Sequence, residues 1–292
     1  MLKNNYKTKD IPVIFLTGMN DAASELYGLD LGAIDYIIKP FSSPLLRKRV
    51  ETHIMVEKQR KKLQDYNENL QKMVVEKTQT ILKLQNKVLR AMAELVEGRD
   101  TFTGDHIERT QVCLGVLISA MHEKGVYREE TNGWDIGLLL QSSQLHDVGK
   151  IAIQDSILKK PGKLTLAEFE EMKKHVIYGV NFIEELEEDE EDSLFLKYAK
   201  IFAHYHHERW DGSGYPNKLS RMDIPLLGRL MAIVDVYEAL ISERCYKPAL
   251  DHQAAVNIIL QGRGTNFDPI LVDIFEKCSE QLRISTTLKV EK

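Results

Sequence analysis

The sequence has few cysteines, and none of them stands in an arrangement that does chemistry. Three occur in 292 residues, Cys113, Cys245 and Cys278, and no two are spaced as a CxxC pair. This spacing argues against a zinc–thiolate site and against a disulfide framework. We therefore expect reduced thiols that serve mainly in packing.

Long apolar runs and an excess of positive charge are also missing. No stretch approaches the roughly 20 apolar residues that span a bilayer, and the opening MLKNNYKTKD lacks the apolar core of a signal peptide. We therefore expect a cytoplasmic protein with no membrane span. The formal net charge of −5 argues against nucleic-acid binding, but it leaves room for a basic pocket that takes an anionic small molecule.

Residues 1–50 alternate between strand-like and helix-like stretches. IPVIFLTG (11–18) is an apolar run that ends at glycine, DAASELYGLDLG (21–32) is helix-like, and AIDYIIKPF (33–41) is strand-like. This order resembles the C-terminal half of a response-regulator receiver domain, with Thr17 after its fourth strand and Lys39-Pro40 after its fifth. The acidic pocket and the phosphate-accepting aspartate have no counterpart. We expect a partial receiver domain that does not signal by phosphorylation.

Residues 51–97 form a charged segment without glycine or proline, which is typical of a helix. A series at alternating spacings of four and three follows the a/d pattern of a coiled coil, with one lysine in the seam. The series is Leu70, Val74, Lys77, Ile81, Leu84, Val88, Ala91 and Leu95. We expect a linker helix that forms a parallel homodimer. An amphipathic helix lying on the next domain is the alternative.

Residues 98–292 are mostly helical in pattern and contain the groups that could do chemistry. Five histidines stand in polar motifs (TGDHIER, LHDVGK, MKKHVIYG and HHE), and one aspartate interrupts the apolar run AIVDVYEAL, where a lone carboxylate is costly. The five imidazoles and two carboxylates suit Fe, Mn, Co or Ni better than a cysteine-type zinc site. Seven ligands exceed the needs of one four-coordinate ion, so a metal pair bridged by Asp147 accounts for them. The seven are His106, His146, Asp147, His175, His206, His207 and Asp235.

Two long motifs carry a more specific resemblance. HDVGKIAIQDSILKKPGKLTLAEFEEMKKH (146–175) and HHERWDGSGYP (206–216) resemble the HD-GYP branch of the HD phosphohydrolase superfamily, over roughly residues 90–276. The resemblance implies a mainly α, all-helical HD-type domain over residues 98–292. It implies a phosphodiesterase that opens cyclic di-GMP to linear pGpG, with GMP as a further candidate product. It also implies two divalent transition-metal ions, Fe or Mn ahead of Co or Ni, and a diguanylate cyclase as a candidate partner.

The resemblance also assigns roles to individual residues. The first metal would be held by His106, His146, Asp147 and Asp235, and the second by His175, His206, His207 and the shared Asp147. Lys150, the other catalytic candidate besides Asp147, would face a phosphate or the departing oxygen. The substrate would lie against Gly214, Tyr215, Pro216, Arg244 and Lys247. Arg109 and Glu208 would orient metal ligands.

The sequence departs from the family pattern at two places. Some relatives carry a glutamate four residues before the first histidine, where it supports a third metal; Phe102 stands there, so we expect two metals. The usual DALTSxRPYK reads EALISERCYK, with Glu238 in place of an aspartate near Arg244. Two alternatives stay open: a weakly active, metal-containing module that binds nucleotides or proteins, and a phosphodiesterase for another cyclic dinucleotide such as cyclic GMP-AMP.

Overall fold

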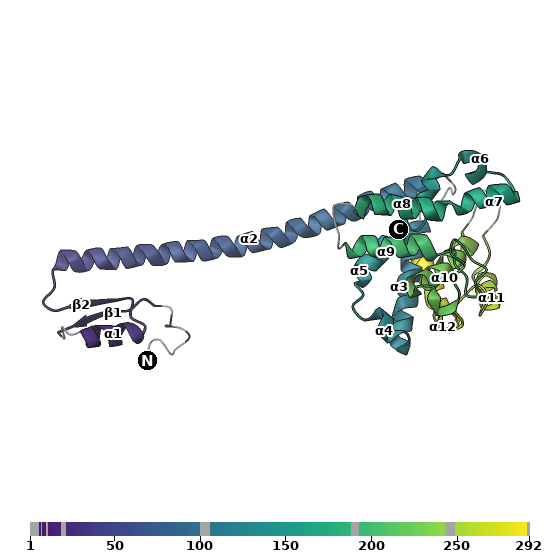
Figure 1. Cartoon of the computed structure of the whole chain (residues 1–292). Helices are drawn as coiled ribbons and strands as arrows, with labels where there is room; N and C mark the ends of the chain where they lie inside the picture. The colour runs from purple at the N-terminus through teal and green to yellow at the C-terminus, as the bar shows by residue number, and fades with distance from the viewer. Residues whose placement is uncertain are drawn as a thin grey trace. The chain divides into compact units, whose positions relative to one another are not determined.

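The structure is a computed structural model that describes residues 6, 8–9, 11–18, 22–99, 106–187, 193–242 and 249–290. Within these residues the chain is mainly helical, as the sequence predicts, with two short strands near its N-terminus (Figure 1). It divides into two compact units, Met1–Ile81 and Leu82–Lys292. No helix in the described part of the chain is long and apolar enough to cross a membrane.

The N-terminal unit contains a small βαβ arrangement. Strands β1 (Ile14–Thr17) and β2 (Asp35–Ile38) pair in parallel, and α1 (Ala22–Asp30) connects them. Such a crossover is required because parallel neighbours run from the same end of the sheet. The Lys39–Pro40 peptide bond that follows β2 is cis.

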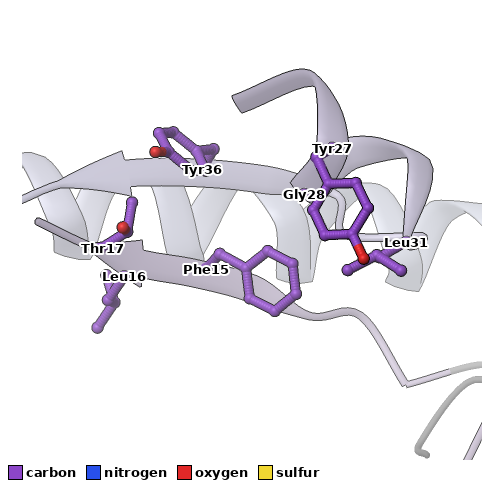
Figure 2. Close-up of a pocket in the computed structure, with 7 residues that line it drawn as sticks. All are labelled: Phe15, Leu16, Thr17, Tyr27, Gly28, Leu31 and Tyr36. Carbon is purple, nitrogen blue, oxygen red and sulfur yellow. The ribbon is translucent and has the colours of Figure 1, made fainter. Parts of the chain in front are cut away.

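A hollow of about 240 Å³ lies beside these strands (Figure 2). In Figure 2 the ring of Phe15 extends from β1 on the side where Tyr27 and Leu31 lie. None of the lining residues carries a carboxylate, an imidazole or an amine, so the hollow is not a catalytic candidate. The lining consists of Phe15, Leu16, Thr17, Tyr27, Gly28, Leu31 and Tyr36.

Helix α2 (Ser43–Glu97) is 55 residues long and contains the whole predicted linker. It begins within the segment predicted as a partial receiver, with Pro44 in its first turn, where the missing backbone N–H costs nothing. Near its start, Asp35 of β2 accepts hydrogen bonds from Arg49 at 2.8 Å and makes a 3.0 Å contact with His53 Nε2. Most of the helix is exposed, and its buried residues lie in the last turns before Glu97.

The C-terminal unit is built from helices around one main apolar core. The buried helix α10 (Leu226–Ile241) contacts α3, α9, α11 and α12, and Leu230, Met231 and Ile233 are fully buried. A smaller cluster lies between α8 and α9. The other helices are α3 (His106–Lys124), α4 (Arg128–Thr131), α5 (Ile136–Ser142), α6 (Asp155–Leu158), α7 (Leu166–Lys173), α8 (His175–Glu187), α9 (Leu194–Tyr205), α11 (His252–Gln261) and α12 (Pro269–Val290), with 3-10 turns η2 (Ser143–Leu145), η3 (Val148–Ala152) and η4 (Arg221–Asp223).

Side-chain caps set where several of these helices begin. Asp135, Ser193 and Asp251 each accept a hydrogen bond from a backbone N–H in the first turn of α5, α9 and α11. At α7, Thr165 and Glu168 form a reciprocal capping box. Such caps satisfy N–H groups that have no partner inside the helix. Two of these capped helices, α7 and α9, end just before the candidate ligands His175 and His206.

Candidate metal centre and active site

The seven predicted ligands come together in the C-terminal unit, although they lie on different elements. His106 begins α3, the His146-Asp147 pair lies between η2 and η3, and His175 begins α8. His206 and His207 follow the end of α9, and Asp235 lies on α10. Three overlapping groups of side chains could each hold a metal ion, with ligand atoms within 4.8 Å of one another. The groups are Asp147–His175–His206–His207, His146–Asp147–Asp235 and Glu97–His106–His146.

A very close backbone approach places the His146-Asp147 turn against α8. A Cβ atom on Gly149 would lie 1.9 Å from the carbonyl oxygen of His175 and 2.4 Å from the backbone nitrogen of Gly179. Glycine is therefore required at position 149. The packing brings Asp147 next to the imidazole of His175.

The backbone selects the same tautomer for three of the histidines. Nδ1 of His146 lies 2.9 Å from the carbonyl oxygen of Ser143, and Nδ1 of His175 and of His206 also contact carbonyl oxygens, at 2.7 and 2.8 Å. Because a carbonyl oxygen only accepts, Nδ1 carries the proton in each ring. The Nε2 lone pairs are left free for a metal ion.

These Nε2 atoms converge on the carboxylate of Asp147. Oδ1 lies 3.2 Å from Nε2 of His175 and 3.6 Å from Nε2 of His206, and Oδ2 lies 3.4 Å from Nε2 of His146. These contacts lack hydrogen-bond geometry: all three Nε2 atoms and Oδ1 are buried without a hydrogen-bond partner in the described structure. Buried acceptors that face one another are costly unless a cation lies between them. The donor set therefore fits metal ions.

Asp147 belongs to two of the three groups, so the carboxylate is placed to bridge. On one side is Asp235, whose Oδ1 lies 3.9 Å from Nε2 of His146. On the other side, the His207 ring lies 4.0 Å from that of His206 and 5.1 Å from that of His175, centroid to centroid. The group around His175 has the same members as the predicted second ligand set, whereas the predicted first set is divided, with His106 grouped with Glu97 and His146 rather than with Asp147 and Asp235. The metal-binding roles themselves stay predictions.

Burial and neighbouring charges hold three of these groups, His146, His207 and Asp147, in forms that suit metal ligands. Burial lowers the pKa of His146 to about 4, so its imidazole is neutral near pH 7. Burial and the neighbouring His206 hold the pKa of His207 well below its usual range. Burial raises the pKa of Asp147, but Lys150 and the imidazoles outweigh burial and hold it well below its usual value. Asp147 is thus a carboxylate.

His106 is oriented by Glu238, a residue that the sequence marks only as a departure from the family pattern. Glu238 is fully buried and accepts a hydrogen bond from Nδ1 of His106. Arg109 donates to Glu238 at 2.5 Å and to Ser242 at 2.9 Å. Arg109 is predicted to orient a metal ligand, and its link to the ligand His106 is made through the carboxylate of Glu238. Burial lowers the pKa of His106, but Glu238 and Glu97 outweigh it and raise the pKa to about 9.

Comparison with known proteins agrees with this donor set. The family model described as HD domain matches residues 90–271, which is more than half of the chain. The chain belongs to the HD-domain family. The match covers every predicted metal ligand.

Three curated relatives are similar to the chain. A probable cyclic di-GMP phosphodiesterase of Vibrio cholerae is 43% identical over 94% of this chain and 62% of its own length. A cyclic di-GMP phosphodiesterase response regulator of Xanthomonas campestris is 32% identical over 94% of this chain and 69% of its own length. A 3'3'-cGAMP-specific phosphodiesterase of V. cholerae is 40% identical over 68% of this chain and 35% of its own length. The chain thus spans about three fifths of the first relative's length.

Glu97 lies beside the HD-domain centre and was not predicted. It ends α2, is 7% exposed, and its Oε1 lies 3.6 Å from Nε2 of His106. Burial raises its pKa to about 7. The only signal for Glu97 in the sequence is that an acidic residue follows the apolar pair Leu95-Val96 at the end of a helix. The position that the family pattern points to, Phe102, lies outside the described residues.

Arg99, two residues after α2, holds the segment that follows the HD motif. Its guanidinium donates to the carbonyl oxygens of Lys150 at 3.2 Å, Ile151 at 2.7 Å and Ile153 at 2.8 Å. It also donates to the carboxylate of Asp155 at 2.6 Å. The sequence gives no signal for this role, because the partners lie more than 50 residues away. Arg99 therefore ties the end of α2 to the backbone of Lys150.

Lys150 and the glycine-rich loop lie next to the cluster, as predicted. Nζ of Lys150 lies 2.7 Å from Oδ2 of Asp147. The ring of Tyr215 lies 4.7 Å from that of His207, centroid to centroid, and the Tyr215–Pro216 peptide bond is cis. A Cβ atom on Gly214 would lie 2.4 Å from the backbone nitrogen of Arg209, so no other residue fits there.

The prediction for Glu208 needs a correction. Its buried carboxylate accepts hydrogen bonds from the backbone N–H groups of Asn217 at 2.7 Å and Leu219 at 3.0 Å. These are the groups after the Gly-Tyr-Pro motif, so Glu208 holds the loop rather than orienting a metal ligand. A neighbour of the HH pair in sequence need not face the same way, because the helix has already ended at Tyr205. The predicted phosphate contacts Arg244 and Lys247 lie outside the described residues.

Proposed function

We propose that this chain is a metal-dependent phosphodiesterase that opens cyclic di-GMP to linear pGpG. The observation that carries the proposal is the carboxylate of Asp147, on which three buried imidazole nitrogens without hydrogen-bond partners converge. The similarity to relatives named as cyclic di-GMP phosphodiesterases supports the choice of substrate. The oxygen and nitrogen donors suit hard or borderline cations and a phosphodiester substrate.

Two divalent ions, Fe or Mn ahead of Co or Ni, fit this donor set. His106, His146 and Asp235 would hold one ion and His175, His206 and His207 the other, with Asp147 between them. When bound, two such ions supply Lewis acidity and positive charge at the reacting phosphodiester. Glu97 adds one more carboxylate on the His106 side.

The protein's own groups would bind and orient the substrate around this centre. Lys150, held at 2.7 Å by Asp147, carries a positive charge to the phosphate and can neutralise charge on the departing oxygen. Burial raises the pKa of Tyr215, so its phenol keeps its proton and can donate a hydrogen bond to substrate. Asp235 lies on α10, most of whose residues are buried in the main apolar core, so the carboxylate is attached to a well-packed helix.

A phosphodiesterase for cyclic GMP-AMP is the second candidate. The specific observation in its favour is the 40% identity to a relative named as 3'3'-cGAMP-specific. The two substrates share their phosphodiester ring and differ in one base. Competition between them in one turnover assay separates the two candidates.

A homodimer through α2 is part of the proposal. The apolar residues of the a/d seam are all exposed on the single chain: Leu70, Val74, Ile81, Leu84, Val88, Ala91 and Leu95. Burying such a seam against a second copy is the usual reason for this spacing. The parallel βαβ arrangement, together with a relative named as a response regulator, supports a partial receiver domain at residues 1–50. A diguanylate cyclase as partner stays a prediction.

The test of the proposed function is hydrolysis of cyclic di-GMP by protein purified without oxygen and supplied with ferrous iron or manganese. We expect pGpG as the first product and no turnover after the metal is removed by a chelator. Turnover that persists unchanged in the chelated protein would contradict the proposal. Faster turnover of cyclic GMP-AMP in the competition assay would favour the second candidate.

A further inference from the structure

A second, larger pocket is bordered by Tyr215 and by none of the predicted metal ligands. Its volume is about 700 Å³. One wall is the junction of α7 and α8, and the other is the Gly-Tyr-Pro loop. The lining residues are Phe169, Glu170, Lys173, Lys174, Ile177, Arg209, Ser213, Gly214, Tyr215, Pro216 and Lys218. None of the predicted metal ligands lines it, so the pocket is not the metal centre.

Tyr215 connects this pocket to the metal centre. One neighbour of its ring is His207, a candidate ligand, at 4.7 Å between centroids. The other is Phe169 of α7, at 6.4 Å and nearly perpendicular. A molecule in the pocket would therefore lie one aromatic ring away from the metals. A cyclic dinucleotide has that reach, because its bases extend outward from the ring that contains the phosphates.

The charges of the pocket favour an anionic ligand. Four basic side chains and one acidic side chain line it. Two of the basic side chains have acidic partners, Lys173 with Glu170 and Lys174 with Glu171. For Arg209 and Lys218 we find no ion-pair partner among the residues that the structure describes. These two cations are available to a phosphate or to the acceptor atoms of a base.

An acceptor and a donor lie side by side in the lining of the pocket. Oε1 of Glu170 lies 2.6 Å from Nζ of Lys173. The same Nζ lies 5.0 Å from the ring centroid of Phe169 and 5.6 Å from that of Tyr215. Phe169 is 44% exposed, so part of its ring is accessible from the pocket. Exposed aromatic faces of this kind are the surfaces on which nucleobases stack.

We propose that this pocket is the subsite for one guanine of the substrate, with Phe169 as its stacking surface and Glu170 and Lys173 as its hydrogen-bonding partners. On its Watson–Crick edge guanine offers two donor groups, N1–H and N2–H₂, beside one acceptor, O6. The two carboxylate oxygens of Glu170 and the ammonium of Lys173 match that order. Adenine offers only one donor and one acceptor on this edge, so it leaves one carboxylate oxygen unpaired. The inference rests on the proposed function, because it takes a cyclic dinucleotide as the ligand.

The test compares Glu170→Gln with Glu171→Gln in the full, metal-loaded chain. Both glutamates pair with a lysine three residues on, but only Glu170 lines the pocket. The substrates are cyclic di-GMP, cyclic di-AMP and bis(4-nitrophenyl) phosphate, which has no base. The readout is the kcat/KM for each cyclic dinucleotide divided by the kcat/KM for the base-free diester. This ratio is insensitive to changes in metal loading, which affect all three substrates.

For Glu170→Gln we expect the cyclic di-GMP ratio to fall tenfold to a hundredfold, since a hydrogen bond to a charged group is lost. In Glu170→Gln the preference for cyclic di-GMP over cyclic di-AMP should become smaller. In Glu171→Gln the cyclic di-GMP ratio and this preference should both stay within about twofold of their wild-type values.

Phe169→Ala should lower both dinucleotide ratios, because every base has a face that stacks. Its control is Leu166→Ala, which changes an exposed residue of α7 outside the pocket. Equal ratios in Glu170→Gln and Glu171→Gln would overturn the guanine subsite.

Binding of a slowly cleaved phosphorothioate analogue of cyclic di-GMP separates failure of this inference from failure of the proposed function. In one outcome, the wild-type chain turns over no cyclic di-GMP but binds the analogue, and Glu170→Gln weakens that binding at least tenfold. This outcome would support the guanine subsite and contradict the proposed function. If the wild-type chain hydrolyses cyclic di-GMP and both glutamate variants bind the analogue equally, the guanine subsite is contradicted and the proposed function is not. No binding by the wild-type chain overturns both.

Discussion

His106 donates the hydrogen on Nδ1 to the carboxylate of Glu238, which lies 132 residues further along the chain. The contact is buried, and it turns Nε2 of the imidazole toward the candidate metal centre. The hydrogen bond from His106 and the charge of Arg109 outweigh burial and lower the pKa of Glu238 to about 2, so it is a carboxylate at neutral pH. Carboxylate–histidine pairs of this kind raise the basicity of a ligand and fix its direction.

Replacing Glu238 should therefore weaken metal binding. For Glu238→Gln we expect a metal affinity about 10- to 100-fold lower, because the neutral amide no longer supports the His106 imidazole. The measurement is competition for manganese with a chromophoric chelator of known affinity. The control is Ser242→Ala, which removes a 2.7 Å hydrogen bond to Glu238 and a 2.9 Å hydrogen bond from Arg109 but leaves the carboxylate of Glu238 in place. Wild-type affinity in Glu238→Gln would show that His106 needs no carboxylate partner.

Arg99 should act on turnover through the position of Lys150. In Arg99→Ala the segment after the HD motif loses its hydrogen bonds to the end of α2, so we expect kcat to fall about 10- to 100-fold with a smaller change in KM. Steady-state kinetics with cyclic di-GMP measures this. The matched control is Arg90→Ala, which removes ion pairs to Glu94 and Glu108 but no contact to the Lys150 segment. Equal effects of the two replacements would exclude the positioning role.

The sequence was sufficient to predict which residues come together in the cluster, and insufficient to predict the residues that support them. His146, Asp147, His206 and His207 stand in short motifs at the ends of helices, where a few residues determine both the backbone and the side-chain direction. Glu97 and Arg99 gain their roles only from partners brought near by the packing of α2 and η3. That packing leaves no local pattern in the sequence.

Glu208 and Glu238 both show that the position of a residue in a motif does not determine what its side chain contacts. Glu208 stands next to the paired histidines, yet its carboxylate serves the backbone of the following loop. Glu238 replaces an aspartate of the family pattern, yet it keeps a carboxylate for His106 and Arg109. In both cases the residue type was informative, and the direction of the side chain was decided by tertiary contacts.

The capping box of α7 should make stability depend on pH in the acid range. Lys160 and the groups of Thr165 hold the pKa of Glu168 at about 2, below its usual 4.5. A lowered folded-state pKa means that the stabilisation is complete above about pH 4.5 and is lost as the pH falls toward 2. Glu168→Gln should thus lower the midpoint of urea unfolding at pH 7, and the deficit should shrink between pH 4.5 and pH 3. A deficit that is constant across this range would contradict the assignment.

The α2 seam should control the association of two chains. In Leu84→Glu a charge replaces an apolar seam residue in each chain, and the loss of two buried leucines, about 3 kcal/mol or more, corresponds to dimer dissociation at least 100-fold easier. Sedimentation equilibrium of the full chain measures this. The control is Leu82→Glu, which changes an equally apolar, exposed residue outside the a/d series. A wild-type chain that is monomeric at micromolar concentration would contradict the dimer.

The most direct test of the bridged centre is to count metals and turnover on the same oxygen-free sample, for the wild-type chain and for Asp147→Ala. Asp147 is the one carboxylate shared by the two groups that contain His175 and Asp235. We predict close to two metals per chain with hydrolysis of cyclic di-GMP in the wild type, and loss of both metals and of turnover in the variant. Two metals retained in Asp147→Ala would contradict the bridge. Two metals without turnover in the wild type would contradict the phosphodiesterase.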